Sequence, residues 1–283
     1  MNKEKILSIL KSRKTFKIGR IVLIVFVVLV ALYFGGKAGL NYFIGDDGLA
    51  GMPCYKSGNT AVIEIRGEIV SYFVYTPVSD KSDSDDSNDA VSSEEVSDCI
   101  DNIRNDDGIK GVVVEIDSGG GSPFASEEIM NAIKGLNKPT VAVIREAGDS
   151  GAYLIASATN RIFASELSDV GGIGATYSYL DNSQQNIQNG LTFNQLSVGK
   201  FKDAGNPDKP LTAEEETLYM RDATILYQYF IKMVAENRGL DIEKVKQLAD
   251  GSSMLGLQAK ESGLIDEIGD INSAIAWLQS KIK

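Results

Sequence analysis

The hydrophobic positions of this chain fall into short, densely apolar runs separated by amphipathic stretches. Residues 110–117 contain Gly-Val-Val-Val-Glu-Ile, which is apolar on both faces. Such a strand is covered on both sides, as in α/β proteins. The predicted strands are residues 61–65, 110–117, 140–144, 161–164, 174–180 and 191–198. Because helices and short loops separate them, they predict a parallel α/β core.

The amphipathic stretches predict helices with clear start and stop signals. Ser122 followed by Pro123 marks a helix start, since serine caps a helix and proline fits its first position. Thr212 and Glu215 form a capping box, and Gly239 ends the long helix that follows. The predicted helices are residues 93–105, 123–136, 183–189, 212–238, a short helix capped by Asp241, and 271–282.

The N-terminus has the pattern of a membrane anchor. The first 20 residues carry seven basic side chains and one acidic side chain, whereas the whole chain has a formal charge of −11. The apolar run that follows, counted from Ile18 to Gly36, has 19 residues, enough to span a bilayer. A basic N-terminal flank stays in the cytoplasm. We therefore expect a cytoplasmic tail (1–20), a transmembrane signal anchor (21–36), a linker (37–59) and an extracytoplasmic domain (60–283).

A cleaved signal peptide is the alternative to the anchor. Gly36-Lys37-Ala38 is a poor cleavage site, because a lysine separates the small residues and no helix breaker precedes them. An uncleaved anchor is therefore the preferred interpretation. It places the domain beside the cell membrane, on the outer side.

Residues 21–283 carry a formal charge of −17, which disfavours nucleic acid as a partner. Part of this charge lies in residues 79–93, a Ser- and Asp-rich stretch predicted to be a mobile acidic insertion. Asp83, Asp85 and Glu94 have the spacing of a calcium loop, but Asn88 stands where the turn glycine belongs. A solvated loop is the preferred interpretation.

Cys54 and Cys99 are the two cysteines of the chain. They either pair in an oxidising compartment or stay apart. Cys99 lies on the apolar side of a predicted helix, which favours burial as a small hydrophobic side chain.

Residues 147–156 form the most distinctive stretch for chemistry. Two glycines, Gly148 and Gly151, surround Ser150 at the start of a short helix of small residues. Such a turn suits a nucleophile whose reaction creates an oxyanion. The alternative is that Asp149 or Ser150 only caps the helix.

The chain has no histidine, which excludes a Ser-His-Asp triad and most catalytic zinc sites. A nucleophilic serine would then need a lysine or a carboxylate as base. A lysine base must be neutral, which requires lowering its pKa by about three units at a cost of about 4 kcal/mol. Lys200 and Lys202 follow the predicted strand 191–198. One of the two lysines could turn toward the protein interior and act as the base, or both could remain in solvent, as charged side chains usually do.

Gly119, Gly120 and Gly121 follow the buried strand 110–117. A glycine loop at the carboxyl end of a strand brings bare backbone N–H groups close to a ligand. No Lys-Ser or Lys-Thr pair follows, and Phe124 replaces the third glycine of the dinucleotide pattern. Binding of an oxyanion or a peptide backbone is therefore preferred over nucleotide binding.

Several motifs in this order together resemble the signal peptide peptidase A family in its short bacterial form. They are Asp117-Ser118-Gly119-Gly120-Gly121, Lys138-Pro139-Thr140, Asp149-Ser150-Gly151-Ala152-Tyr153, Gly171-Gly172-Ile173-Gly174, Gly199-Lys200-Phe201-Lys202-Asp203 and the stretch 256–269. The resemblance covers about residues 60–270 and includes the N-terminal anchor.

The resemblance implies a ClpP/crotonase-like α/β fold with a repeated β-β-α core and C-terminal helices. It implies a Ser–Lys peptidase with Ser150 as nucleophile and Lys202 as general base, without a metal or cofactor. Gly119, Gly120 and Gly151 would bind the oxyanion. It further implies a ring of identical subunits, with serine and lysine from adjacent copies, acting on remnant signal peptides in the membrane.

Three positions depart from the family pattern. Gly119 replaces a proline, Ala152 replaces a glycine, and Gly172 replaces a serine whose hydroxyl lies near the lysine. These departures favour one alternative, a non-catalytic membrane-anchored ring that binds peptides. A crotonase-like enzyme acting on an acyl thioester is a third hypothesis, which the acidic body disfavours.

Overall fold

One mixed sheet runs through the described part of the chain, residues 53–73 and 90–282, in the computed structural model. Its strands are β1 (Cys54–Ser57), β2 (Thr60–Val70), β3 (Ala90–Ser92), β4 (Gly111–Gly121), β5 (Thr140–Asp149), β6 (Ile162–Ala164), β7 (Asp169–Gly171), β8 (Ser253–Leu255) and β9 (Glu267–Ile268). The main order is β1-β2-β4-β5-β6-β9, in which only β1 is antiparallel to its neighbour. The parallel core predicted from the sequence is confirmed.

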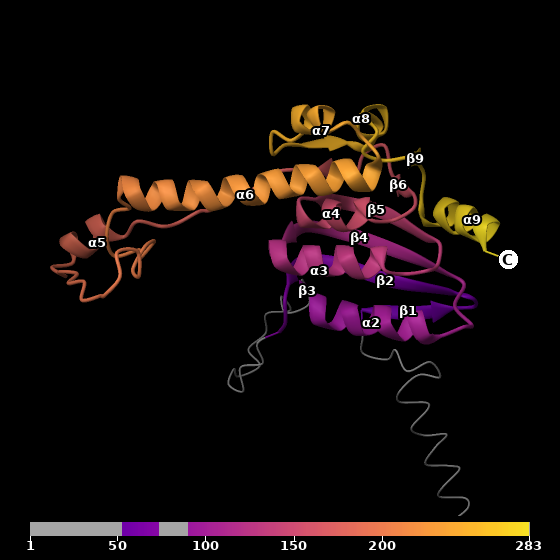
Figure 1. Cartoon of the computed structure of the whole chain (residues 1–283), viewed down its shortest axis with the longest axis horizontal. Helices are drawn as coiled ribbons and strands as arrows, with labels where there is room; N and C mark the ends of the chain where they lie inside the picture. The colour runs from indigo at the N-terminus through magenta and orange to yellow at the C-terminus, as the bar shows by residue number, and fades with distance from the viewer. Residues whose placement is uncertain (1–52, 74–89, 283) are drawn as a thin grey trace, which may run out of the picture. The chain divides into compact units, whose positions relative to one another are not determined.

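Helices cover both faces of this sheet (Figure 1). They are α2 (Ser93–Asn105), α3 (Pro123–Lys134), α4 (Gly151–Ser157), α5 (Ser183–Gln188), α6 (Ala213–Arg238), α7 (Ile242–Leu248), α8 (Gly256–Ser262) and α9 (Ile271–Lys281). The helices α2, α3 and α4 lie in a row along one face (Figure 1). On the other face, Leu278 of α9 packs against Val113 and Val143 of the central strands. Burial on both faces explains why these strands are continuously apolar.

The predicted helix signals act as expected. The Ser122 hydroxyl caps α3, with Pro123 in the first turn. Thr212 and Glu215 form the capping box of α6, and Gly239 ends that helix in the left-handed conformation. These are local interactions, which is why the sequence shows them.

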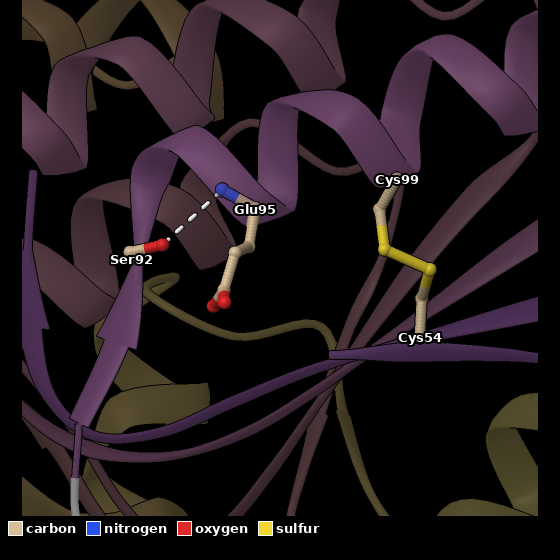
Figure 2. Close-up of a disulfide and its surroundings, with 4 residues drawn as sticks. All are labelled: Cys54, Ser92, Glu95 and Cys99. Carbon is tan, nitrogen blue, oxygen red and sulfur yellow. Dashed lines mark hydrogen bonds between the residues drawn. A yellow bond between two sulfur atoms is a disulfide. The ribbon is translucent and has the colours of Figure 1, made fainter. Parts of the chain in front are cut away.

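Cys54 and Cys99 form a disulfide with their Cα atoms 6.3 Å apart. Figure 2 shows this bond joining β1 to α2, near the Ser92 hydroxyl that accepts a hydrogen bond from the Glu95 N–H. Cys99 is buried as predicted, but the preferred interpretation as an unpaired hydrophobic side chain was wrong. The strand β1 lies within residues 37–59, the stretch predicted to be a linker, and it pairs with β2.

Two of the predicted strands do not form. Residues 174–180 and 191–198 have no strand or helix structure, and residues 187–202 are all exposed. Among the described residues, neither segment pairs with an edge of the sheet. The helix predicted between them is present as α5.

The predicted anchor (21–36), the basic tail (1–20) and most of the acidic insertion (79–93) lie outside the described residues. The last residues of that insertion, from Ala90, belong to β3 and the start of α2. Among the described residues, no helix is long and apolar enough to cross a membrane.

The 26-residue helix α6 connects two parts of the fold. Near its C-terminal end, Asn237 donates a hydrogen bond to the Ser157 hydroxyl of α4. Near its N-terminal end, the Tyr219 hydroxyl donates to the Ala204 carbonyl, and the Tyr219 ring contacts Tyr177. Figure 1 accordingly shows α5 and its adjoining loops at one end of α6 and the sheet beneath the other.

Candidate active site

Ser150 occupies the sharp turn between β5 and α4. Its φ of 52° makes it the one residue other than glycine with a positive φ among the described residues. A side chain held in that region costs about 1–3 kcal/mol, and such strain is concentrated at functional sites. The Ser150 side chain makes no capping hydrogen bond to α4. Ser150 thus occupies the N-cap position of α4 without capping it through its side chain.

The small residues around this turn allow very close approaches between backbone segments. A Cβ atom at Gly151 would lie 2.1 Å from the Ser126 Oγ of α3. A Cβ at Gly120 would lie 2.8 Å from the Ser150 Cβ and 2.9 Å from the Gly151 nitrogen. Because such separations are impossible for real Cβ atoms, glycine is required at both positions. The glycine loop after β4 thus lies directly against the serine turn.

A cavity of about 810 Å³ opens at Ser150. Gly119, Ser150 and Gly151 are among its lining residues. Leu226, Tyr227, Tyr229 and Phe230 of α6 also line the space. The sequence did not identify these α6 residues as part of the site. The cavity combines apolar and aromatic side chains with glycine backbone and a few polar groups, as is typical of ligand pockets.

The charged side chains in the cavity lining of the described chain are Asp149 and Asp250, both acidic. Burial, and then the nearby charge of Asp169, raise the pKa of the Asp149 carboxyl above its ordinary value. Hydrogen bonds from Ser252 lower the pKa of Asp250. Burial, together with a hydrogen bond to Glu127, raises the pKa of Tyr229 to about 12. The cavity lining is therefore acidic and, among the described residues, includes no lysine or arginine side chain.

The predicted oxyanion donors differ in their availability. The Gly120 N–H already donates a hydrogen bond to the Ser118 hydroxyl at 3.1 Å. Gly119 is exposed with open space around it, and Gly151 is buried at the start of α4. The first N–H groups of a helix have no intrahelical partner. Gly120 is thus a predicted donor whose N–H is already engaged within the chain.

Lys202 lies apart from Ser150 within the described chain. It is exposed and does not line the Ser150 cavity. Its loop packs against the start of α6 through Ala204 and Tyr219, whereas the cavity contacts α6 at Tyr229. Ten residues of helix correspond to about 15 Å along the axis. The chain thus brings together Ser150, Gly119, Gly120 and Gly151, but not Lys202.

Lys200, the other candidate base, is also exposed and forms an ion pair with Glu214 at 2.6 Å. In the described residues, no group of three His, Cys, Asp or Glu side chains is placed to hold a metal ion. As the described part of the chain forms it, the lining of the Ser150 cavity therefore contains two carboxyl groups, those of Asp149 and Asp250, and no lysine.

Comparison with known proteins gives a family match and several relatives. Residues 132–283 match the family model for peptidase family S49. A provisionally named protease of Methanocaldococcus jannaschii is 33% identical over 64% of this chain and 58% of its own. A provisionally named signal peptide peptidase SppA of Enterococcus faecium is 34% identical over 64% of this chain and 54% of its own. The chain thus spans somewhat more than half the length of these two relatives.

The chloroplastic serine protease SPPA of Arabidopsis thaliana is 31% identical over 68% of this chain and 29% of its own. Among solved structures, a mutant of ClpP1 from Listeria monocytogenes superimposes with a TM-score of 0.50 at 15% identity. The alignment covers 76% of this chain and 94% of the other. At this identity the likeness concerns the fold alone, and it agrees with the predicted ClpP-like α/β architecture.

Proposed function

Because the chain belongs to peptidase family S49, we propose that it is a serine endopeptidase with Ser150 as its nucleophile. The predicted family and its enzyme class, the serine peptidases, are supported by the family match and by the relatives named as proteases. The observation that carries the residue assignment is the strained turn that holds Ser150 at the edge of a large cavity.

The proposed general base is Lys202 of a neighbouring copy of the chain. Ser150 needs a base, the chain has no histidine, and the Lys202 of the same chain lies outside the cavity. Lys202 belongs to a segment, residues 187–202, that is exposed throughout. An assembly of copies accounts for both facts, because the segment of one copy then reaches the cavity of the next.

In this arrangement the Ser150 Oγ attacks the peptide carbonyl carbon while the neutral amine of Lys202 takes its proton. The negative charge formed on the carbonyl oxygen is bound by the N–H groups of Gly119 and Gly151. The lysine ammonium then protonates the departing amine, which leaves an acyl-serine. Water, deprotonated by the same amine, hydrolyses this ester and restores the serine hydroxyl.

The proposed substrates are apolar peptides, in particular remnant signal peptides at the membrane. The aromatic side chains of α6 give the cavity an apolar wall that suits such segments. The predicted anchor at residues 21–36 would hold the site beside the bilayer. The disulfide supports an extracytoplasmic domain, since disulfides persist in oxidising compartments.

The exposed segment offers the surface for assembly. Leu196 and Val198 are 98% and 97% exposed, an unusual state for large apolar side chains. Replacing both with aspartate should dissociate the assembly, which light scattering of the detergent-solubilised chain would measure. Retention of the wild-type mass in this variant would contradict a role of the segment in assembly.

The assignment is tested with the full chain purified in detergent and an apolar fluorogenic peptide. Ser150→Ala and Lys202→Ala should each lower kcat by about a thousandfold or more. Lys200→Ala is the matched control in the same loop and should retain activity, because Lys200 pairs with Glu214. A fluorophosphonate should label Ser150 in the wild type only. Wild-type rates in both variants, or peptide binding without turnover or labelling, would favour a non-catalytic scaffold.

A further inference from the structure

Asp149 is an anomaly in the wall of the Ser150 cavity. Its Oδ1 atom is enclosed and has no hydrogen-bond partner among the described residues. An unpaired buried carboxylate oxygen is destabilising, and native proteins contain few of them. Asp250, the other carboxylate of the cavity, accepts hydrogen bonds from the Ser252 N–H and hydroxyl at 2.9 and 2.6 Å. The unsatisfied group is therefore specifically the one that precedes the nucleophile.

The Asp149 carboxyl has one enclosed oxygen, Oδ1, and the residue lines the Ser150 cavity. The backbone of Gly172 lies beside it, and a Cβ atom at Gly172 would be 3.5 Å from the Asp149 Oδ1 and 3.1 Å from the Ser150 nitrogen. Asp149 is half-buried and lines the cavity. Rotation about its Cβ–Cγ bond is soft, so either oxygen can face the cavity. The carboxyl thus lines the same cavity as Ser150.

The charges facing Asp149 give it no compensation. Asp169 on the adjacent strand β7 is acidic, as is Asp250 across the cavity. From α6, Tyr227 and Tyr229 line the cavity with neutral phenols. The described parts of α3 and α4 contribute no titratable side chain to this lining. A carboxylate in such a setting is complementary to a hydrogen-bond donor that is cationic.

We infer that Asp149 is a positioning residue that accepts a hydrogen bond from the amine of the lysine base entering the cavity. This inference rests on the proposed function. An amine that takes the Ser150 proton must come within about 3 Å of the serine Oγ, inside the cavity that Asp149 also lines. The contact orients the amine. The raised pKa of Asp149 in the isolated chain agrees with a group that lacks this partner.

The arrangement has two opposing effects on the reaction. Orientation of the amine toward Ser150 raises kcat, because misplacement of a reacting group by 1 Å costs up to about a hundredfold. The negative charge, however, favours the protonated amine, which cannot act as base. Removing the charge should therefore move the acidic limb of the pH–rate profile to lower pH, even while kcat falls.

The test compares Asp149→Ala, Asp149→Asn and Asp98→Asn in the full chain. Asp149→Ala should lower kcat by roughly ten- to a hundredfold with little change in KM, and should shift the acidic limb to lower pH. Asp149→Asn keeps the acceptor and should recover most of kcat while retaining the pH shift. Asp98→Asn is the control at an exposed carboxylate of α2 outside the cavity and should leave both kcat and the acidic limb near wild type.

Thermal unfolding separates positioning from a structural role. Because the Asp149 oxygen is unpaired, Asp149→Ala and Asp149→Asn should unfold at the wild-type temperature or above it. A lower unfolding temperature in both variants, with kcat falling in parallel, would indicate a structural residue and overturn the inference. Wild-type kcat and pH profile in Asp149→Ala would also overturn it.

A basic side chain of the substrate is the other source of a primary ammonium. Two substrate peptides, one with lysine and one with norleucine in its place, distinguish the lysine base from a substrate lysine. If Asp149 contacts the lysine base, Asp149→Ala should lower kcat equally for both peptides. If the effect disappears with norleucine, Asp149 binds substrate instead. If Ser150→Ala and Lys202→Ala are inactive but Asp149→Ala has normal activity, only this inference is refuted. If Ser150→Ala is active, the proposed function is refuted together with this inference.

Discussion

The surroundings of Ser150 and of Lys202 differ in almost every structural respect. Ser150 directly follows β5, a strand paired on both sides and buried over Thr140–Ile144. Lys202 lies in a segment without regular structure whose residues 187–202 are all exposed. One region is held by the core, whereas the other is held mainly by its contacts with the start of α6. The core alone therefore positions the proposed nucleophile, and the proposed base requires a further surface.

This difference indicates how the two halves of the site are made. The strain at Ser150 is tolerated because the close contacts of Gly120 and Gly151 fix the turn. No comparable packing fixes Lys202. If a neighbouring copy supplies the missing packing, the proposed site exists only in the assembly, and isolated subunits are inactive. That dependence would confine peptide cleavage to assembled protein.

Mixing the variants Ser150→Ala and Lys202→Ala should give the largest effect and tests whether the two groups come from different copies of the chain. Ser150→Ala retains Lys202, and Lys202→Ala retains Ser150, so a mixed assembly contains some sites with both groups. Random assembly of equal amounts should restore about one quarter of the wild-type activity per site. A mixture of Ser150→Ala with the double variant should stay inactive. Mixed assemblies, verified by two different affinity tags, that show no activity would place both groups on one chain.

Removal of the disulfide should give the next largest effect, a loss of stability confined to the core. Cys54 and Cys99 are 45 residues apart, for which the chain-entropy estimate of the stabilisation is about 4 kcal/mol. Replacing both with alanine should lower the free energy of unfolding by about 3–4 kcal/mol. Hydrogen exchange should increase in β1 and α2 while residues 190–205 exchange as in the wild type. Equal increases in both regions would mean that they form one cooperative unit.

The sequence predicts the core because its signals there are local. The apolar run of β4, the Ser122 cap and the Thr212 capping box each depend on neighbours in the chain. Residues 191–198 have the same kind of apolar pattern, but whether such a run pairs depends on a sheet edge that no local pattern specifies. The short strands β7, β8 and β9 were missed for the same reason.

In the candidate site, too, the features set by local sequence could be predicted and those set by distant contacts could not. The glycines around Ser150 indicate a tight turn, and the structure contains one. The pairing of Cys54 with Cys99, the aromatic wall from α6 and the unpaired carboxyl of Asp149 all depend on contacts between distant segments. Asp149 in particular appears in the sequence only as a possible helix cap, because burial without a partner is a property of the folded chain.

Alanine substitutions at the neighbouring residues Gly119 and Gly120 should give a smaller effect on stability, confined to the Ser150 region. Gly120 has a φ of +101°, and an added Cβ would meet the Ser150 Cβ and the Gly151 nitrogen. Gly120→Ala should therefore lower the free energy of unfolding by about 2–3 kcal/mol and displace Ser150, with loss of activity. Gly119 has open space, so Gly119→Ala should change stability by less than about 0.5 kcal/mol. Urea unfolding measures both, and equal stabilities would contradict the described packing.

The smallest expected effect concerns the contacts that hold the Lys202 region. A hydrogen bond from Lys209, then one from the Thr212 N–H, lower the pKa of Glu215 to about 2. A carboxyl whose pKa is depressed on folding stabilises the fold above its ordinary pKa of about 4.5 and loses this contribution as the pH falls toward 2. The start of α6 and the adjoining loop should therefore loosen in that interval, before the core unfolds.

Pepsin cleavage between residues 200 and 216, followed by mass spectrometry from pH 4.5 to 2, measures this loosening. Glu215→Gln should cleave readily across the whole interval, because the ion pair is absent at every pH. Glu214→Gln is the matched control: its pair with Lys200 is exposed, and exposed pairs contribute little. If Glu215→Gln and the wild type are cut alike at pH 4.5, the Lys209–Glu215 contact does not hold this region. The weak attachment of the Lys202 loop would then rest on Tyr219 and its neighbours alone.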